Sequence, residues 1–501
     1  MARRVSTALL FSLTAFAAAF PAAATSYQMM SDRDLTDQAA AVAAVRVIGV
    51  EQAPASRQVA TDYIVEVDSV LKGSLPGSTL VVRVLGGMGS DGIGLKIWGA
   101  PAFEEGERAI LFLLPADDGT YRILHMMLGA FHERPTLDGK KVAVRDLAEA
   151  HPVGNRGPEL YRDFTAFSNW IRDRGLSIDR LADYFLPQGT TAIRGGFEKF
   201  IFLADAEGTA DRWFRFDQGR TVEWRVFEGG QPGLGLGDTI EAFQIGLNTW
   251  NDDPRTDIRY VYVGTTDANA GFTTHDGVNT ILFDDPHRGE LREVPGSFSC
   301  PAGGVIAVGG PWFFAATLPY QGYTVHESVE AEVITNDGTE CLFRNNRKVA
   351  EEVFTHELGH TLGLGHTDVE DAIMFSSVHN DGRGAAVKQD DLDGIAEFYR
   401  VTGKPQTKVP AAPAKLAVRA TSDDRVMMTW SDKAKNELGF MVEAKIGTAG
   451  TFQEVGSAPP NAKSLPETGL EPGESYSFRL RAYNRKGFSA YSNTVTIKMR
   501  D

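Results

Sequence analysis

One eleven-residue segment, residues 356–366, constrains this 501-residue chain more than any other stretch of it. It reads HELGHTLGLGH and contains three of the ten histidines. On a helix, His356 and His360 would lie on the same face, one turn apart. Gly363 can adopt the left-handed backbone conformation that ends such a helix, which would let His366 return toward the other two. The segment therefore predicts a helix, a turn and three imidazoles directed at one point.

Three neutral imidazoles form a ligand set for Zn²⁺ that leaves one tetrahedral position open for water, as in catalytic rather than structural zinc sites. Glu357, beside the first histidine, is placed to accept the proton of that water. Histidine pairs on helices are often structural, and an isolated H-E-x-x-H motif produces false positives. The longer pattern fixes three histidines, one glutamate and one glycine, so we interpret it as a catalytic zinc site.

The segment resembles the zinc signature of the metzincin metalloproteases, in which a methionine turn follows the third histidine. Met374 lies eight residues after His366, in the sequence DAIMF, and the resemblance implies that it forms the floor beneath the ligands. Residues 389–399, whose first acidic residues suit a helix N-terminus, are similar to the last catalytic-domain helix of matrixins. Thr367 stands where the astacin-like and adamalysin-like branches typically have an acidic residue, so we favour the matrixin branch.

The resemblance implies a multidomain protein with an α+β catalytic domain over residues 208–401, in which a twisted mixed sheet packs on the zinc helix. The spacing of large apolar residues predicts a further helix over 240–250. The expected strands cover residues 220–227, 256–263, 279–283, 305–310 and 331–334. The strand at 305–310 resembles the matrixin edge strand, which pairs with extended substrate by β-augmentation.

One catalytic zinc is the expected cofactor. Mammalian matrixins hold a second, structural zinc close to the edge strand, but Val308 and Gly309 offer no ligand side chain at that place. Calcium is the other ion considered, because Asp284-Asp285 and Asn336-Asp337 supply hard oxygens in turn contexts. The same residue types are ordinary turn formers, which is the alternative interpretation of both clusters.

Cys300 and Cys341 are the only cysteines. In an exported protein an even number of cysteines suggests a disulfide, and two unpaired buried thiols are the alternative. Many matrixins are kept latent by a propeptide cysteine that occupies the open zinc position. No cysteine precedes Cys300, so the sequence excludes a thiolate latch from the N-terminal region.

Residues 1–24 have the pattern of a secretory signal peptide, with two arginines, a short apolar run and small residues ending at Ala24. The run is too short for a comfortable membrane span, so we expect cleavage after Ala24, with an uncleaved anchor as the alternative. The expected location is therefore secreted, either extracellular or periplasmic in transit, without membrane insertion. A net charge of −16 argues against nucleic acid as a partner.

Short alternating runs separated by turns predict a small all-β domain, a barrel or a sandwich, over residues 25–150. Its role is open between a prodomain, an inhibitory module acting in cis and a substrate-binding module. Helical spacing predicts a helical linker region over 151–207, and composition predicts a second linker over 402–412. Residues 413–501 resemble a fibronectin type III domain, a β-sandwich, on Trp430 and on the LEPGESY motif that ends at Tyr476.

Two functions remain in competition. The first is a secreted zinc endopeptidase that hydrolyses internal bonds of protein or peptide substrates. The second is a non-catalytic surface adhesin or binding protein on the same scaffold. In that case the C-terminal domain would bind extracellular matrix or surface polysaccharide, although this domain could equally be a spacer. Retention of Glu357 favours the peptidase, because a binding scaffold has no need of a proton acceptor.

Overall fold

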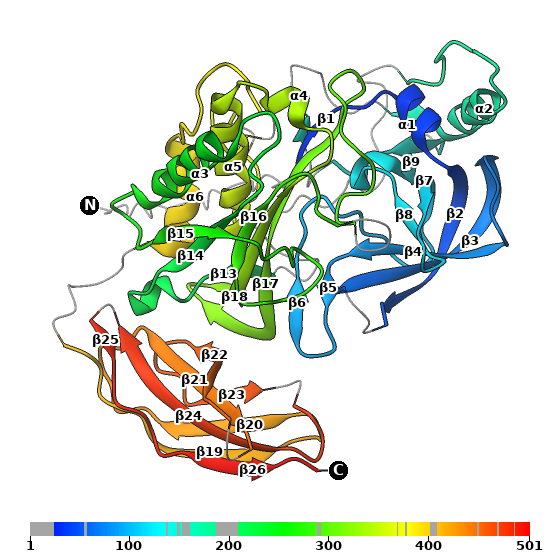
Figure 1. Cartoon of the computed structure of the whole chain (residues 1–501). Coiled ribbons are helices and arrows are strands. Elements are labelled where there is room, and N and C mark those ends of the chain that lie inside the picture. The colour runs from blue at the N-terminus through cyan, green and yellow to red at the C-terminus, as the bar shows by residue number, and fades with distance from the viewer. Residues whose placement is uncertain are drawn as a thin grey trace, which may run out of the picture.

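The computed structural model has three regions, which Figure 1 shows in blue to cyan, green to yellow, and orange to red along the chain. The predicted signal peptide, residues 1–24, lies outside the described residues, as do residues 402–407 of the second predicted linker. Within the described ranges, no helix is long and apolar enough to cross a membrane. The structure describes residues 25–54, 58–136, 139–147, 151–152, 161–186, 209–287, 292–367, 369–375, 378–400, 408–447, 450–467, 470–484 and 486–500.

The central region is built on a mixed sheet whose strands follow the order β17-β18-β16-β14-β15. Strands β18, β16, β14 and β15 run parallel to one another, and β17 runs antiparallel to β18. A short strand, β13, pairs in parallel with β18. These strands are β13 (Thr209–Arg212), β14 (Val222–Phe227), β15 (Tyr260–Thr266), β16 (Asn279–Leu282), β17 (Gly304–Tyr320) and β18 (Tyr323–Thr335).

Helices α3 (Leu236–Asn251) and α5 (Arg347–Thr361) pack against each other and against this sheet (Figure 1). Aromatic rings form the contact, since Phe243 of α3 meets both Trp224 of β14 and Phe354 of α5. Gly246 permits the close approach, because a Cβ at this position would lie 2.9 Å from the hydroxyl of Thr355. This burial fixes α5, the helix that carries the first two histidines. Two shorter helices, α4 (Glu340–Phe343) and α6 (Gln389–Tyr399), flank it in the chain.

The N-terminal region contains an eight-stranded sheet in the order β12-β10-β9-β7-β2-β3-β4-β8. Strand β8 pairs with both β4 and β7, so β7, β2, β3, β4 and β8 close into a barrel, one of the two architectures expected. The sheet strands are β2 (Ala41–Gln52), β3 (Ala60–Lys72), β4 (Thr79–Leu85), β7 (Arg108–Pro115), β8 (Tyr121–Ile123), β9 (Ala130–Pro135), β10 (Lys141–Val144) and β12 (Arg162–Asp163). Helix α1 (Asp32–Gln38) and the 3₁₀ turn η1 (Met126–Gly129) belong to the same region.

The segment expected to be a helical linker contains helix α2 (Phe164–Gly175), which packs on the barrel region. Its Phe167 ring contacts Phe131 of β9 and Tyr184 in the segment that follows. The helix ends at Gly175, and Ser177 adopts a positive φ of 63°. Apolar residues beyond this point, including Leu181 at 87% exposure, therefore do not continue the helical face that their spacing suggested.

Residues 305–310 lie in β17, and the outer edge of this strand is paired within the same chain. Strand β1 (Thr25–Gln28) pairs antiparallel with β17 along residues 304–308. Strand β6 (Ile93–Leu95) pairs with the same edge at residues 312–314. Two further short strands extend these pairings, with β5 (Gly87–Met88) beside β6 and β11 (His151–Pro152) beside β1. The edge is occupied because segments distant in sequence reach it, which local patterning does not reveal.

The C-terminal region is a β-sandwich of two antiparallel sheets. One sheet has the order β19-β20-β23, and the other has the order β22-β21-β24-β25 with β26 paired to β24. Trp430 packs on Phe440 in the core, and the hydroxyl of Tyr476 accepts a hydrogen bond from the backbone of Glu471 at 2.9 Å. The strands are β19 (Ala414–Ala420), β20 (Val426–Ser431), β21 (Gly439–Ile446), β22 (Gln453–Ala458), β23 (Ser464–Glu467), β24 (Ser475–Asn484), β25 (Gly487–Phe488) and β26 (Val495–Lys498).

Cys300 and Cys341 form a disulfide with a Cα–Cα distance of 6.3 Å across 41 positions of sequence. Breaking it frees this loop in the unfolded chain, so the double change Cys300→Ser, Cys341→Ser should lower the free energy of unfolding by about 4 kcal/mol. Urea denaturation followed by tryptophan fluorescence measures the change. The wild type under reductant should show a similar loss, and the double variant should be insensitive to reductant. An unchanged denaturation midpoint would contradict the stabilising role.

Candidate metal centre

Helix α5 begins and ends where its sequence provides the caps. The side chain of Asn346 accepts a hydrogen bond from the backbone N–H of Val349 at 3.4 Å, which satisfies one of the free donors of the first turn. At the other end Gly363 has a φ of +88°, a conformation that an L-residue with a Cβ rarely adopts. The N–H of Leu364 then donates to the carbonyl of Gly359 at 3.0 Å, and the chain turns back over the helix.

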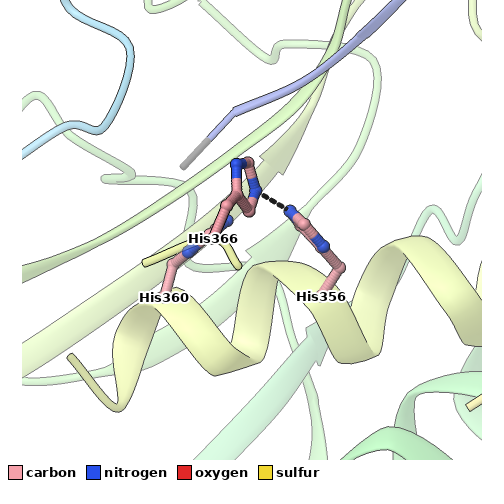
Figure 2. A group of neighbouring side chains, drawn as sticks. All are labelled: His356, His360 and His366. Carbon is pink, nitrogen blue, oxygen red and sulfur yellow. Dashed lines mark hydrogen bonds between the residues drawn. The ribbon is translucent and has the colours of Figure 1, made fainter. Parts of the chain in front are cut away.

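This turn brings the three predicted ligands together (Figure 2). His356 and His360 project from α5, and His366 faces them from the segment after the turn. One nitrogen of each ring lies within 4.8 Å of the others, and the Nε2 atoms of His356 and His366 are 2.5 Å apart. All three side chains are buried. The spacing read from the sequence therefore corresponds to a compact group of imidazoles.

Backbone carbonyls orient two of these rings. Nδ1 of His356 lies 2.8 Å from the carbonyl oxygen of Ile373, and Nδ1 of His360 lies 2.8 Å from that of Leu364. A carbonyl oxygen can only accept a hydrogen bond, so each Nδ1 must carry the proton. The lone pair of each neutral ring is therefore on Nε2, directed toward the other histidines, which is the arrangement in which imidazole binds a metal ion.

The electrostatics of the cluster also suit a cation. Burial lowers the pKa of His356 to about 4 and the pKa of His360 well below its usual value, so both rings are neutral near pH 7. Nε2 of His360 is fully buried without a hydrogen-bond partner among the described residues. A buried lone pair without a partner is costly, and a metal ion would remove that cost. The residues present therefore fit a bound Zn²⁺, for which three histidines are a common ligand set.

Glu357 lies on the same helix and is fully buried. Its Oε1 accepts a hydrogen bond from the hydroxyl of Ser26 at 2.5 Å, and its Oε2 has no hydrogen-bond partner among the described residues. Burial raises the pKa of this carboxyl to about 8. Gly309 of β17 lies directly against it, since a Cβ there would be 3.2 Å from Oε2. The carboxylate is thus held between the zinc helix and β17.

Met374 lies against α5, the helix that carries His356 and His360. It is buried against α5, where a Cβ at Gly359 would collide with its sulfur atom. Asp391, in the first turn of α6, holds this segment in place. Its carboxylate accepts hydrogen bonds from the backbone N–H groups of Ile373 and Met374, both at 2.8 Å. Because the carbonyl of Ile373 in turn orients His356, the carboxylate of Asp391 helps to fix the position of that histidine.

Sequence reasoning missed both Asp391 and Ser26 as residues of the site. Asp391 fitted a helix N-terminus on charge alone, and nothing local indicates that it also binds the methionine turn. Ser26 contacts Glu357 across 331 positions of sequence. Neither contact leaves a periodic or motif signal.

The residues considered for calcium engage the protein's own donors and charges. Asp285 accepts a hydrogen bond from the N–H of Val294 at 2.9 Å, and Asp337 forms an ion pair with Arg292. Asp284 accepts from the N–H of Gly338 at 3.3 Å. These contacts join the two turns to each other. Roles in the turns therefore account for the presence of these residues without a bound ion.

The contacts of Asp391 generate a test. Asp391→Asn replaces one of the two carboxylate oxygens with an NH2 group and leaves one of the two N–H groups of the methionine turn without an acceptor. We expect zinc affinity to fall by about 10- to 100-fold, as for other residues that orient metal ligands. Competition with a chromogenic chelator measures this affinity. The neighbouring variant Asp390→Asn, at an exposed position, is the matched control and should bind zinc like the wild type. Equal affinities in the two variants would reject the positioning role.

Comparison with known proteins agrees with this geometry. Residues 212–400 match the sequence model of the matrixin family, and residues 411–498 match that of the fibronectin type III domain. The chain is similar to Metalloendoproteinase 5-MMP of Arabidopsis thaliana, with 49% identity over 49 residues, 10% of this chain and 14% of that protein. Human Matrilysin is 44% identical over 46 residues, which are 9% of this chain and 17% of Matrilysin.

The chain spans less than a fifth of the length of these two relatives. Among solved structures, the FN5 domain of Drosophila Lar is similar at 20% sequence identity, covering 19% of this chain and 99% of that chain with a TM-score of 0.17. The chain therefore contains a matrixin region, residues 212–400, followed by a fibronectin type III domain, residues 411–498.

Proposed function

We propose that this protein is a secreted zinc-dependent endopeptidase that hydrolyses internal bonds of protein or peptide substrates. The observation that carries the proposal is the pairing of two features on α5. Three buried histidines converge so that one ring nitrogen of each lies within 4.8 Å of the others, and a buried carboxylate, Glu357, lies beside them. The match of this region to the matrixin family supports the same activity.

In this proposal His356, His360 and His366 hold one Zn²⁺. When bound, the ion supplies Lewis-acid chemistry, polarising the scissile carbonyl and lowering the pKa of water. The carbonyl groups of Ile373 and Leu364 keep two of the imidazoles in the metal-binding tautomer, and Asp391 keeps Ile373 in position. The methionine floor at Met374 excludes water from below the ligands.

Glu357 is the proposed general base. Its carboxylate accepts the proton of the attacking water and then donates it to the nitrogen of the leaving amine. Burial raises the pKa of this carboxyl above its usual value, which makes it a stronger proton acceptor than a solvated carboxylate. The same residue distinguishes the peptidase from a binding protein on the same scaffold, which would gain nothing from a buried acid at this place.

The C-terminal fibronectin type III domain gives the alternative function its support. A surface adhesin would use this domain to bind matrix or polysaccharide, and its sandwich also suits a spacer. Arg220 of the matrixin region forms an ion pair with Glu454 of the domain at 2.6 Å, so the two regions are in contact. We favour the peptidase because the chemical features of α5 have no role in adhesion.

The general-base role predicts the behaviour of Glu357→Gln, which keeps the size of the side chain and removes its proton-accepting charge. We expect hydrolysis of a quenched fluorescent peptide to fall by about 10²- to 10⁴-fold. Zinc content, measured by elemental analysis, should stay at one ion per chain, because the three histidines are unchanged. Addition of a chelator should abolish activity in the wild type.

Glu370→Gln is the matched control, since it makes the same change at an exposed position close in sequence to the site. It should keep both the zinc and the activity. Peptide hydrolysis by zinc-loaded Glu357→Gln at the rate of this control would exclude Glu357 as the base. Full activity of metal-free protein would exclude the zinc mechanism.

A further inference from the structure

We propose that two segments of the N-terminal region, residues 25–28 and residues 93–98, act together as an intramolecular inhibitor of the metal centre. They occupy the edge of β17 along which an extended peptide would add as a further strand. The inference rests on the proposed peptidase function and names the regulation of that same site. Of the three roles that the sequence left open for the barrel region, it selects inhibition in cis.

The first segment is β1. It pairs antiparallel with β17, with Thr25 opposite Val308 and Gln28 opposite Gly304. Backbone pairing of this kind is how a sheet edge binds an extended peptide, because the ladder hydrogen bonds do not depend on side chains. The same backbone groups cannot pair with a second strand on that side. While β1 is in place, a substrate has no edge to join over residues 304–308.

The contact at Ser26 reaches the proposed catalytic group itself. The Ser26 hydroxyl donates to Oε1 of Glu357 at 2.5 Å. Figure 2 shows the blue-violet ribbon of the N-terminal strand running beside the three histidines. A carboxylate engaged in this way is not free to take the proton of an attacking water. The strand therefore covers both the binding edge and the base.

The second segment continues the cover along β17. Leu95 lies opposite Trp312 in the β6–β17 pairing, and the N–H of Lys96 donates to the carbonyl of Pro311 at 3.1 Å. A Cβ at Gly310 would collide with the Lys96 carbonyl, so the two backbones are in direct contact. Together the two segments cover residues 304–308 and 311–314 of β17 in the same antiparallel sense.

The two segments are joined to each other and anchored at the far end. The hydroxyl of Thr25 donates to the carbonyl of Trp98, which links the start of β1 to the end of the second segment. Tyr27 is fully buried in a core shared with Leu95 and with Val305 of β17. The amide of Gln28 donates to the carbonyl of Cys300 at 3.2 Å. Together these contacts form an interface in which apolar side chains pack on one face of β1 and the contact to Glu357 lies on the other.

A substrate-binding module would leave the edge of β17 open for the peptide and would place its own binding residues beyond that edge. Here the module fills the edge and caps the proposed base. Since the N-terminal region has no cysteine to occupy a metal, the two segments supply a different means of holding the site inactive. The inhibitory role is therefore the one that the contacts favour.

The test uses the full chain loaded with one zinc ion. Ser26→Glu removes the hydroxyl donor and forces a larger, ionisable side chain into the buried site against Glu357, which is costly and favours displacement of β1. Ser74→Glu adds the same charge at an exposed turn of the N-terminal region and is the matched control. Binding of a fluorescent peptide hydroxamate and hydrolysis of a quenched peptide are measured for both variants and the wild type. We expect Ser26→Glu to bind the hydroxamate at least about tenfold more tightly and to hydrolyse the peptide at least about tenfold faster.

Ser26→Ala, which removes only the hydroxyl donor, keeps the test decisive if the glutamate disturbs folding, and we expect the same direction with a smaller effect. Equal hydroxamate binding by folded Ser26→Glu, Ser26→Ala and the control would overturn the proposal. Tighter hydroxamate binding by Ser26→Glu without hydrolysis of any peptide would support the inhibitor and reject the peptidase.

Discussion

The hydrogen bonds from two histidine Nδ1 atoms to backbone carbonyls are the interaction on which the rest of the site depends. They fix His356 and His360 as neutral rings with their Nε2 lone pairs directed at one point. Each carbonyl must itself be held, one by the turn at Gly363 and the other by the Asp391 contact to the methionine turn. The aromatic packing of α3 and the sheet against α5 then serves a local purpose, because it holds the helix that carries His356 and His360.

The features of the site that sequence predicts are those governed by local geometry. The spacing of His356 and His360 follows from the helical repeat, and the positive φ at Gly363 follows from the need to reverse the chain. The strands of the central sheet can be predicted for the same reason, because each is a short run of alternating or apolar residues. The matrixin and fibronectin type III resemblances, which rest on such local patterns, are confirmed by the family comparisons.

The contacts that sequence does not predict join distant segments. Nothing in the composition of residues 25–28 indicates that they pair with residues 304–308, and nothing in residues 93–95 indicates their pairing with residues 312–314. The N-terminal strands were expected, yet closure of the barrel depends on β8 bridging β4 and β7, a pairing with no sequence signature. Short strands of this kind have few side chains to encode their partner, so their register is set by the tertiary structure around them.

The arrangement has an energetic consequence for how such a site could be opened. Because β1 and the 93–98 segment belong to the same chain as the metal centre, they compete with substrate at the high effective concentration of a tethered segment. A peptide must displace backbone pairing along two stretches of β17 while the apolar contacts of Tyr27 are lost. Cutting the chain between β1 and α1 would remove the tether from β1 alone and leave β6 attached through the barrel. Removal of β1 would free Glu357 first, so partial opening would restore the proposed base before it cleared the whole binding edge.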